Sequence, residues 1–153
     1  WSSIKEFKCG IKAIKEFKKP YLIGIHISEG TKLPSGEKIS DIKSIIDDQL
    51  LGVMLSCVSP ENYEINLNEI KNLNVPFGFK LNGFITTKPK NGYTSSFLKN
   101  SGGNPNEFLG HRQDLTPERI GKIAKSFKDR GATILGGCCE TRPLHIEAMA
   151  KLK

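Results

Sequence analysis

Apolar residues follow two patterns that alternate along the chain. One is helical spacing, with an apolar residue at every third or fourth position. This spacing predicts helices over residues 4–18, 40–49, 60–73, 117–130 and from 143 onward. The other pattern is a short unbroken apolar run, typical of a strand whose two faces are both buried. Such runs predict strands over residues 21–27, 50–55, 75–81 and 132–135.

The starts of the predicted helices carry capping signals. Ser59-Pro60 and Thr116-Pro117 each place a hydroxyl N-cap before a proline at the first helical position. Ser40 offers an N-cap for the helix over 40–49, and Pro143 opens the last helix. The inner face of that last helix is expected to hold Ile146, Met149 and Ala150.

The order of these elements predicts the fold class. A helix is followed by four strand–helix units, and this alternation is typical of an α/β protein with a parallel sheet. An open doubly wound sheet and a (β/α)8 barrel are both compatible with it. A barrel has about 250 residues, so four units are half of one. The chain has 153 residues, begins at Trp1 rather than Met and ends inside a predicted helix, so we expect it to be a piece of a longer protein.

Composition excludes several classes of protein. No apolar stretch reaches the roughly 20 residues that cross a bilayer, and the first residues lack the apolar run typical of a signal peptide, so we expect neither membrane spanning nor secretion. The net charge of +7 comes from scattered lysines and only four arginines, which indicates a solvated surface rather than a nucleic-acid site. Four cysteines are too few for a disulfide scaffold. We expect a cytoplasmic protein with no nucleic-acid or membrane partner.

Three of the cysteines follow predicted strands. Cys57 comes after the second strand, and Cys138 and Cys139 come after the fourth, whereas Cys9 lies on the first helix. Parallel strands end at one edge of a sheet, so the three thiols should lie close together near helix N-termini, where thiolates are favoured. Three thiolates suit zinc and leave its fourth position open. Buried inert thiols and a redox pair are the alternatives. Gly136 and Gly137 are expected to let the backbone turn so that both side chains of the pair aim at one point.

Other polar residues are weaker candidates. Residues 82–115 form a long Gly-, Asn-, Pro- and Ser-rich connection at a strand end, which is typical of a lid or binding loop. His111 and Arg112 in this loop are candidates for contact with an anionic group or a partner. His26 and Glu29, which follow the first strand, could face the site, although a structural histidine is the favoured interpretation of His26. His145 on the last helix is interpreted as a residue that supports the ligands or the fold, rather than as a ligand.

Three segments resemble one family, the homocysteine S-methyltransferases. Leu55 to Glu61 resembles a zinc-cysteine segment of that family, with Ser56 where asparagine is usual. Lys80-Leu81-Asn82-Gly83 is similar to its motif around an asparagine on strand seven, with leucine in place of proline. A third segment is similar to the C-terminal signature of the family: it consists of Gly136-Gly137-Cys138-Cys139 with Thr141, Pro143, His145 and Ile146. Glu140 and Arg142 depart from it, next to the N-cap of the last helix.

The resemblance implies a fold and a metal. The fold would be an α/β (β/α)8 TIM barrel of which residues 1–153 supply strands five to eight, the C-terminal half of a homocysteine-binding domain. Zn²⁺ would be held by Cys57, Cys138 and Cys139, with no catalytic residue beyond the metal site. Asn82 would bind substrate or order the site; a turn-forming asparagine before Gly83 is the alternative.

The resemblance also implies an activity. The whole enzyme would transfer a methyl group from a small donor to the thiol of homocysteine, giving methionine. The missing N-terminal half would lie before Trp1, so we expect this chain alone to be inactive and poorly soluble, with uncovered strand edges. Alternatives are the homocysteine-binding module of a larger corrinoid-dependent methionine synthase and a non-catalytic zinc-stabilised module. The sequence does not indicate the methyl donor or the oligomeric state.

Overall fold

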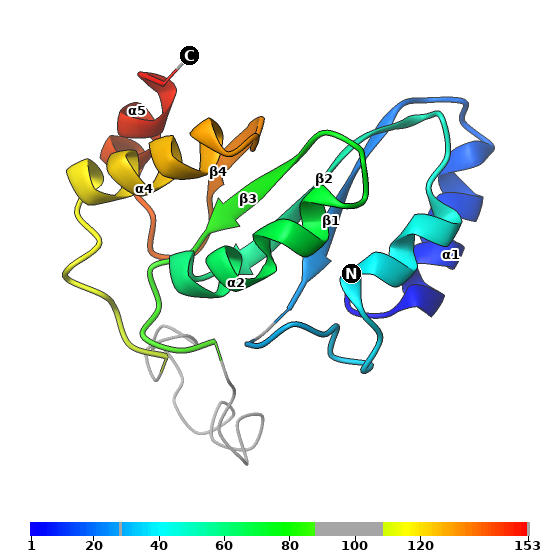
Figure 1. The fold of residues 1–153 in the computed structure, drawn as a ribbon, viewed down its shortest axis with the longest axis horizontal. Helices are drawn as coiled ribbons and strands as arrows, with labels where there is room; N and C mark the ends of the chain where they lie inside the picture. Colours follow the sequence, from blue (N-terminus) through cyan, green and yellow to red (C-terminus); the bar gives the residue numbers. More distant parts are fainter. Residues whose placement is uncertain (28, 88–108, 153) are drawn as a thin grey trace, which may run out of the picture.

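The computed structural model describes residues 1–27, 29–87 and 109–152 (Figure 1). Most of the predicted lid, residues 88–108, lies outside the described residues. The helices and strands are α1 (Ile4–Lys15), β1 (Tyr21–His26), the 3-10 helix η1 (Ile39–Ile45), β2 (Leu50–Val58), α2 (Pro60–Lys71), β3 (Phe77–Leu81), α4 (Pro117–Asp129), β4 (Ile134–Gly137) and α5 (Pro143–Ala150). None of the helices in the described part of the chain has the length and apolarity needed to cross a membrane.

The predicted strands and most of the predicted helices are confirmed, and so are two of the helix caps. The Ser59 hydroxyl accepts a hydrogen bond from the Asn62 N–H at 3.1 Å, and Thr116 caps α4 in the same way. Both helices have proline in their first turn. Each cap satisfies a backbone donor that the helix itself leaves without a partner.

The helix predicted over residues 40–49 is wrong. Residues 39–45 form a 3-10 helix whose N-cap is Lys38, not Ser40. Polar side chains in this segment bond to nearby backbone: Asp41 accepts from the Lys38 N–H, and the Ser44 hydroxyl donates to the Asp41 carbonyl. Such local bonds, together with the β-branched pair Ile45-Ile46, weaken the α-helix relative to a tighter turn.

The four strands form one parallel sheet in the order β1-β2-β3-β4, which confirms the predicted class (Figure 1). Each strand lies beside its neighbour in sequence. Figure 1 shows α1 beside the β1 end of the sheet and the α4–α5 pair beside β4. Because all four strands run in the same direction, their carboxyl ends share one edge, where the candidate cysteines come together.

The two faces of the sheet differ in burial. One face carries Ile23, Ile25, Val53, Leu55, Phe79 and Leu81, all buried in the hydrophobic core. Tyr63 of α2 and Phe127 of α4 pack on this face with Phe79, with ring centroids 4.6–5.6 Å apart. The other face, which we call the open face, includes Leu22, Gly24, His26, Met54, Ser56, Lys80, Ile134 and Gly136, all of which keep some solvent exposure. The core therefore lies on one side of the sheet only.

The prediction that three residues form the inner, buried face of the last helix is wrong for two of them. Met149 is buried, but Ile146 and Ala150 are exposed, and His145 is the second buried residue of α5. His145 replaces a conventional cap: its Nδ1 accepts the Arg142 N–H at 2.9 Å, and its Nε2 lies 2.9 Å from the Leu115 carbonyl oxygen. These two polar contacts turn the histidine inward and rotate the apolar residues outward.

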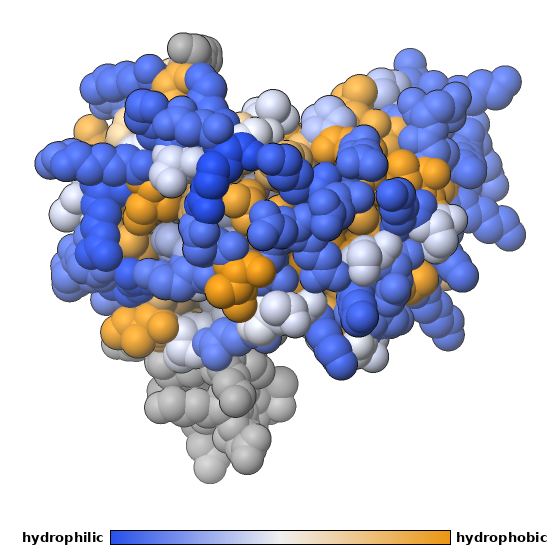
Figure 2. Space-filling view, viewed as in Figure 1, coloured by the Kyte–Doolittle hydropathy of each residue, from blue (hydrophilic) through white to orange (hydrophobic). Residues whose placement is uncertain are grey.

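Most of the surface in the space-filling view is hydrophilic, with apolar residues in small patches between charged ones (Figure 2). The basic residues are partly paired within helices. Lys122 contacts Glu118 at 2.6 Å, and Lys125 contacts Asp129 at 2.7 Å, both one helical turn apart. These exposed pairs are typical of a solvated helix face.

Candidate metal centre

Three cysteines from distant parts of the chain meet at the carboxyl end of the sheet. The sulfurs of Cys57, Cys138 and Cys139, which we call the cysteine cluster, all lie within 4.8 Å of one another. The Sγ atoms of Cys57 and Cys139 are 3.8 Å apart, and those of Cys138 and Cys139 are 3.9 Å apart. All three side chains are half-buried, and Cys9 lies apart on α1, exposed. The structure brings together the three cysteines that the sequence singles out.

Cys57 reaches the cluster through an irregularity in β2. The pairing of β2 with β3 passes from Ser56 opposite Lys80 to Val58 opposite Leu81, so Cys57 is an extra residue without a partner. Its φ is 57°, in the left-handed region that non-glycine residues rarely occupy. Regular alternation would turn Cys57 toward the helix-covered face, as it does Val53 and Leu55. A bulge changes the direction of a side chain in this way, commonly next to a functional site.

The loop after β4 positions Cys138 and Cys139 by backbone hydrogen bonds. The Cys138 N–H donates to the Leu81 carbonyl at 2.7 Å, and the Cys139 carbonyl accepts from the Gly83 N–H at 2.9 Å. The Thr141 hydroxyl donates to the Cys138 carbonyl at 2.6 Å. These bonds tie the cysteine pair to the end of β3. The position of each sulfur is therefore set by the sheet rather than by a free loop.

The predicted role of Gly136 and Gly137 is wrong. Neither has a positive φ; the left-handed residue after the pair is Glu140, at 61°. Gly137 is needed for space instead, because a Cβ there would lie 2.3 Å from the Thr141 hydroxyl oxygen. The close approach of the loop to the strand, and not a glycine turn, aims the two sulfurs.

Asn82 is the residue that connects the bulge to the end of β3. It is fully buried. Its Nδ2 donates to the Cys57 carbonyl at 2.7 Å and lies 3.7 Å from the Cys57 sulfur, while its Oδ1 accepts from the Phe84 N–H at 3.2 Å. The bond to the Cys57 carbonyl is that of a residue that orders the site, and the bond from the Phe84 N–H, two residues on, is that of the turn-forming asparagine predicted as the alternative.

The three thiols share a site that favours ionisation of only one of them. The pKa of Cys138 is lowered, first of all because the Cys57 thiol hydrogen-bonds to it. The same bond, together with burial, raises the pKa of Cys57, and burial raises that of Cys139. Closely spaced anions repel one another, so a second thiolate needs a cation beside it. A divalent metal would supply that charge and allow all three to ionise.

Two of the three spacings between the sulfurs match those around a tetrahedral metal, and the third is no more than 4.8 Å. With Zn–S bonds of about 2.3 Å, tetrahedral coordination places two sulfurs about 3.8 Å apart. The two distances given above, 3.8 and 3.9 Å, agree with that value. Thiolates are soft ligands that select zinc over hard cations. Three protein ligands, with no fourth among the described residues, are typical of a catalytic site rather than a closed structural one.

Comparison with known proteins identifies the family. The model of the homocysteine S-methyltransferase family matches residues 1–152. The chain belongs to the homocysteine S-methyltransferase family. A protein of Bacillus subtilis (strain 168) named homocysteine S-methyltransferase YbgG is 24% identical over 150 residues, which are 96% of this chain. The chain spans 42% of the length of that relative.

The other predicted candidates take different places in the chain. His26 lies at the end of β1 on the open face, and its backbone N–H donates to the Trp1 carbonyl at 2.8 Å. Glu29 is exposed and accepts a hydrogen bond from the Thr86 hydroxyl at 2.6 Å. Both ring nitrogens of His145 are engaged in the capping contacts described above, which confirms its interpretation as structural.

His111 and Arg112 hold the returning end of the long connection against the site. His111 pairs with Phe84 in a short antiparallel bridge, and its Nδ1 lies 3.2 Å from a carboxylate oxygen of Glu140. Arg112 binds Asp114 with two nitrogens and Glu61 with a third, at 2.7–3.1 Å. Arg112 is therefore paired with carboxylates of this chain and is not available to an outside anion in this arrangement.

Two residues near the cluster were missed by the sequence analysis. Glu140 follows Cys139 directly, but only the fold shows its contact with His111. Lys80 alternates with Phe79 and Leu81, which are buried, and this period of two is the signal that places it on the open face. The sequence predicted residues 75–81 as an apolar strand and gave no role to the charge of Lys80.

Proposed function

We propose that this chain forms the metal-holding part of a zinc-dependent homocysteine S-methyltransferase that converts homocysteine to methionine. The observation that carries the proposal is the cysteine cluster, whose three sulfurs all lie within 4.8 Å of one another. Membership of the family supports homocysteine as the methyl acceptor. Because the chain spans 42% of its relative, the activity is proposed for the whole protein that contains it.

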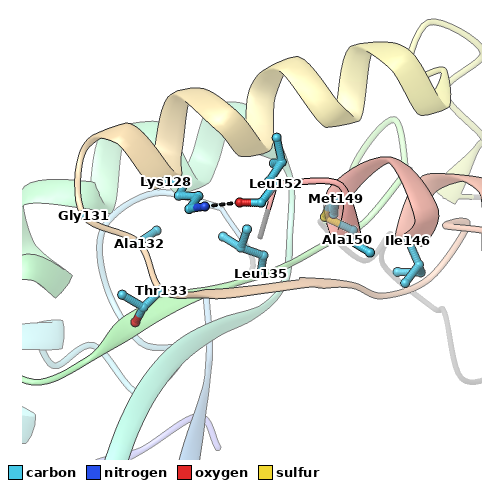
Figure 3. A pocket seen from close by; sticks show the side chains of 9 residues that line it. All are labelled: Lys128, Gly131, Ala132, Thr133, Leu135, Ile146, Met149, Ala150 and Leu152. Carbon is cyan, nitrogen blue, oxygen red and sulfur yellow. Dashed lines mark hydrogen bonds between the residues drawn. The ribbon is translucent and has the colours of Figure 1, made fainter.

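We also propose that β1 to β4 are strands five to eight of a (β/α)8 barrel. Support comes from the parallel order of the strands and from helices that cover only one face of the sheet. A cavity of about 580 Å³ lies between α4, β4 and α5, lined by Leu135, Ile146 and Met149 among others (Figure 3). None of the cysteine cluster lines this cavity. An apolar hollow beside β4 is suited to packing against the next part of a closed barrel.

The proposed chemistry follows from charge. Zn²⁺ bound to the cluster would lower the pKa of the homocysteine thiol and keep it as a nucleophilic thiolate at neutral pH. The thiolate sulfur forms a bond to the methyl carbon as the bond from that carbon to the donor breaks, and the donor leaves with the electron pair. A small cationic donor, a sulfonium or a quaternary ammonium, would leave as a neutral molecule.

The chain's own residues would prepare this reaction by orientation. Cys57, Cys138 and Cys139 direct their sulfurs at one point, and Asn82 holds the bulge from which the first of them projects. Because the backbone bonds on both sides of the cluster are made within the protein, little rearrangement would be needed when metal and substrate enter. Such preorganisation lowers the cost of reaching the reactive geometry.

The test is zinc content and activity in matched cysteine variants. The protein that contains this chain should hold one zinc per chain and form methionine from homocysteine with a sulfonium donor. Cys57→Ala, Cys138→Ala and Cys139→Ala should each lose zinc and activity. Cys9→Ala, which removes the exposed thiol on α1, should keep both. Retention of zinc and activity by all three cluster variants would reject the proposal.

A further inference from the structure

A lysine stands on the open face of the sheet beside the cysteine cluster. In the strand pairing, Lys80 of β3 lies opposite Ser56 of β2 and Gly136 of β4. Paired residues of neighbouring strands project to the same face of the sheet. Lys80 is therefore level with Ser56, the residue before Cys57, and with Gly136, which lies two residues before Cys138. Its side chain is exposed in this chain.

The stem of this lysine lies beside Gly136. A Cβ built on Gly136 would lie 3.4 Å from the Cγ of Lys80, in van der Waals contact. The lysine stem therefore lies over the backbone of β4, the strand that continues into Cys138. The Cys138 N–H is bonded to the carbonyl of Leu81, the residue after Lys80, at 2.7 Å.

A cation in this position would offset the negative charge of the proposed metal centre. Zn²⁺ with three thiolates has a net charge of −1, and a fourth thiolate from the substrate makes it −2. All three cysteine side chains are half-buried, and an unbalanced anion away from water is unfavourable. A lysine ammonium on the same face of the sheet can balance part of this charge without occupying a coordination position.

We infer that Lys80 is the counter-cation of the cysteine cluster, placed on the open face by strand register to stabilise the metal-bound thiolates. The inference rests on the proposed zinc site. Lys80 is a positioning residue here: it acts on the metal ligands, and its contact with substrate is not required. If β1 to β4 are part of a closed barrel, the ammonium is enclosed, and its attraction to the cluster becomes stronger.

The experiment measures zinc affinity by competition with a chromophoric chelator, in the protein that contains this chain. Lys80→Met keeps the length of the side chain and removes its charge, and Lys80→Arg keeps the charge. The matched control is Lys12→Met, on the exposed side of α1. We expect Lys80→Met to weaken zinc binding by about tenfold or more, as the loss of outer-shell partners of metal ligands does elsewhere. Lys80→Arg and Lys12→Met should bind close to the wild-type affinity.

Each failure has a distinct signature. A wild-type protein that binds no zinc rejects the proposed function itself. A wild-type protein that binds zinc, with Lys80→Met binding equally well, rejects only the role of Lys80. Lys80→Gln is a second uncharged variant in case the methionine disturbs folding, which circular dichroism would show. The sulfur-to-metal absorption bands of the Co²⁺-substituted protein give a second readout, expected to shift in Lys80→Met and not in Lys80→Arg.

Discussion

Asn82 provides the sharpest test of how the site is built. Replacing it with alanine removes the amide that bonds to the Cys57 carbonyl at 2.7 Å and to the Phe84 N–H at 3.2 Å. The bulge at Cys57 would then be held in its left-handed conformation without this support. Such conformations are unfavourable by about 1–3 kcal/mol and persist only where the surroundings impose them. The same substitution therefore tests both stability and metal binding.

The size of the effect follows from these contacts. Asn82 is fully buried, so its removal leaves a carbonyl and an N–H without their partners beside the core. Each unsatisfied buried group costs about 1–3 kcal/mol, so Asn82→Ala should lower the free energy of unfolding by about 2–6 kcal/mol. Zinc affinity should fall about 10- to 100-fold, as when other supports of metal ligands are removed. Asn82→Asp should do at least as much harm, because a carboxylate would face the Cys57 carbonyl and sulfur.

The assay is urea denaturation with and without zinc, together with chelator competition. The matched control is Asn68→Ala, which removes the same side chain from an exposed position of α2 and should change stability little or raise it. The reasoning would be refuted if Asn82→Ala lowered the free energy of unfolding by less than about 1 kcal/mol relative to Asn68→Ala and left the zinc affinity unchanged. It would mean that the bulge is held by strand pairing alone.

Two further predictions concern packing and pH. Gly78→Ala should destabilise the fold by about 3 kcal/mol or more, because its Cβ would lie 1.8 Å from the Ile134 carbonyl oxygen. Gly121→Ala in α4, whose Cβ would lie in ordinary contact with the Ala148 Cβ at 3.4 Å, should instead stabilise it by roughly 0.5–1 kcal/mol, and urea melts that rank the two variants the other way would contradict this. Arg112 holds the pKa of Asp114 at about 2, below its ordinary 3.8. This pair therefore stabilises the fold above pH 3.8, and its contribution is lost as the pH falls through 2, so Asp114→Asn should flatten the decline of Tm over that range. Parallel curves of Tm against pH for the two proteins would show that the ion pair contributes nothing.

The fold class could be predicted because it depends on local pattern. Strands buried on at least one face and alternating with capped helices indicate a parallel α/β sheet, and Ser59 and Thr116 begin their helices as expected. The errors lie where tertiary contacts or local polar bonds outweigh periodicity. Residues 39–45 adopt a 3-10 helix under the influence of Asp41 and Ser44, and α5 is rotated by the two hydrogen bonds of His145.

Much of the candidate site could also be predicted. Strand ends place Cys57 near the pair Cys138-Cys139, and the similarity of these segments to the family led to the same three residues. The contacts that aim the sulfurs could not be predicted, because they depend on groups distant in sequence. Gly137 leaves room for Thr141, and the Gly83 N–H binds the Cys139 carbonyl.

The amino-acid sequence by itself determined the order of the elements, the parallel class of the sheet and which residue types could hold a metal. Those properties follow from hydrophobic periodicity, capping and the chemistry of thiols, all of which act over short distances along the chain. Only the tertiary structure decided the direction of Cys57, since alternation alone would turn its sulfur to the covered face. The pairing of β2 with β3 and the amide of Asn82 impose the bulge that points this sulfur toward its two partners. The same pairing places Lys80 beside them, because strand register, which local sequence does not encode, decides which side chains become neighbours.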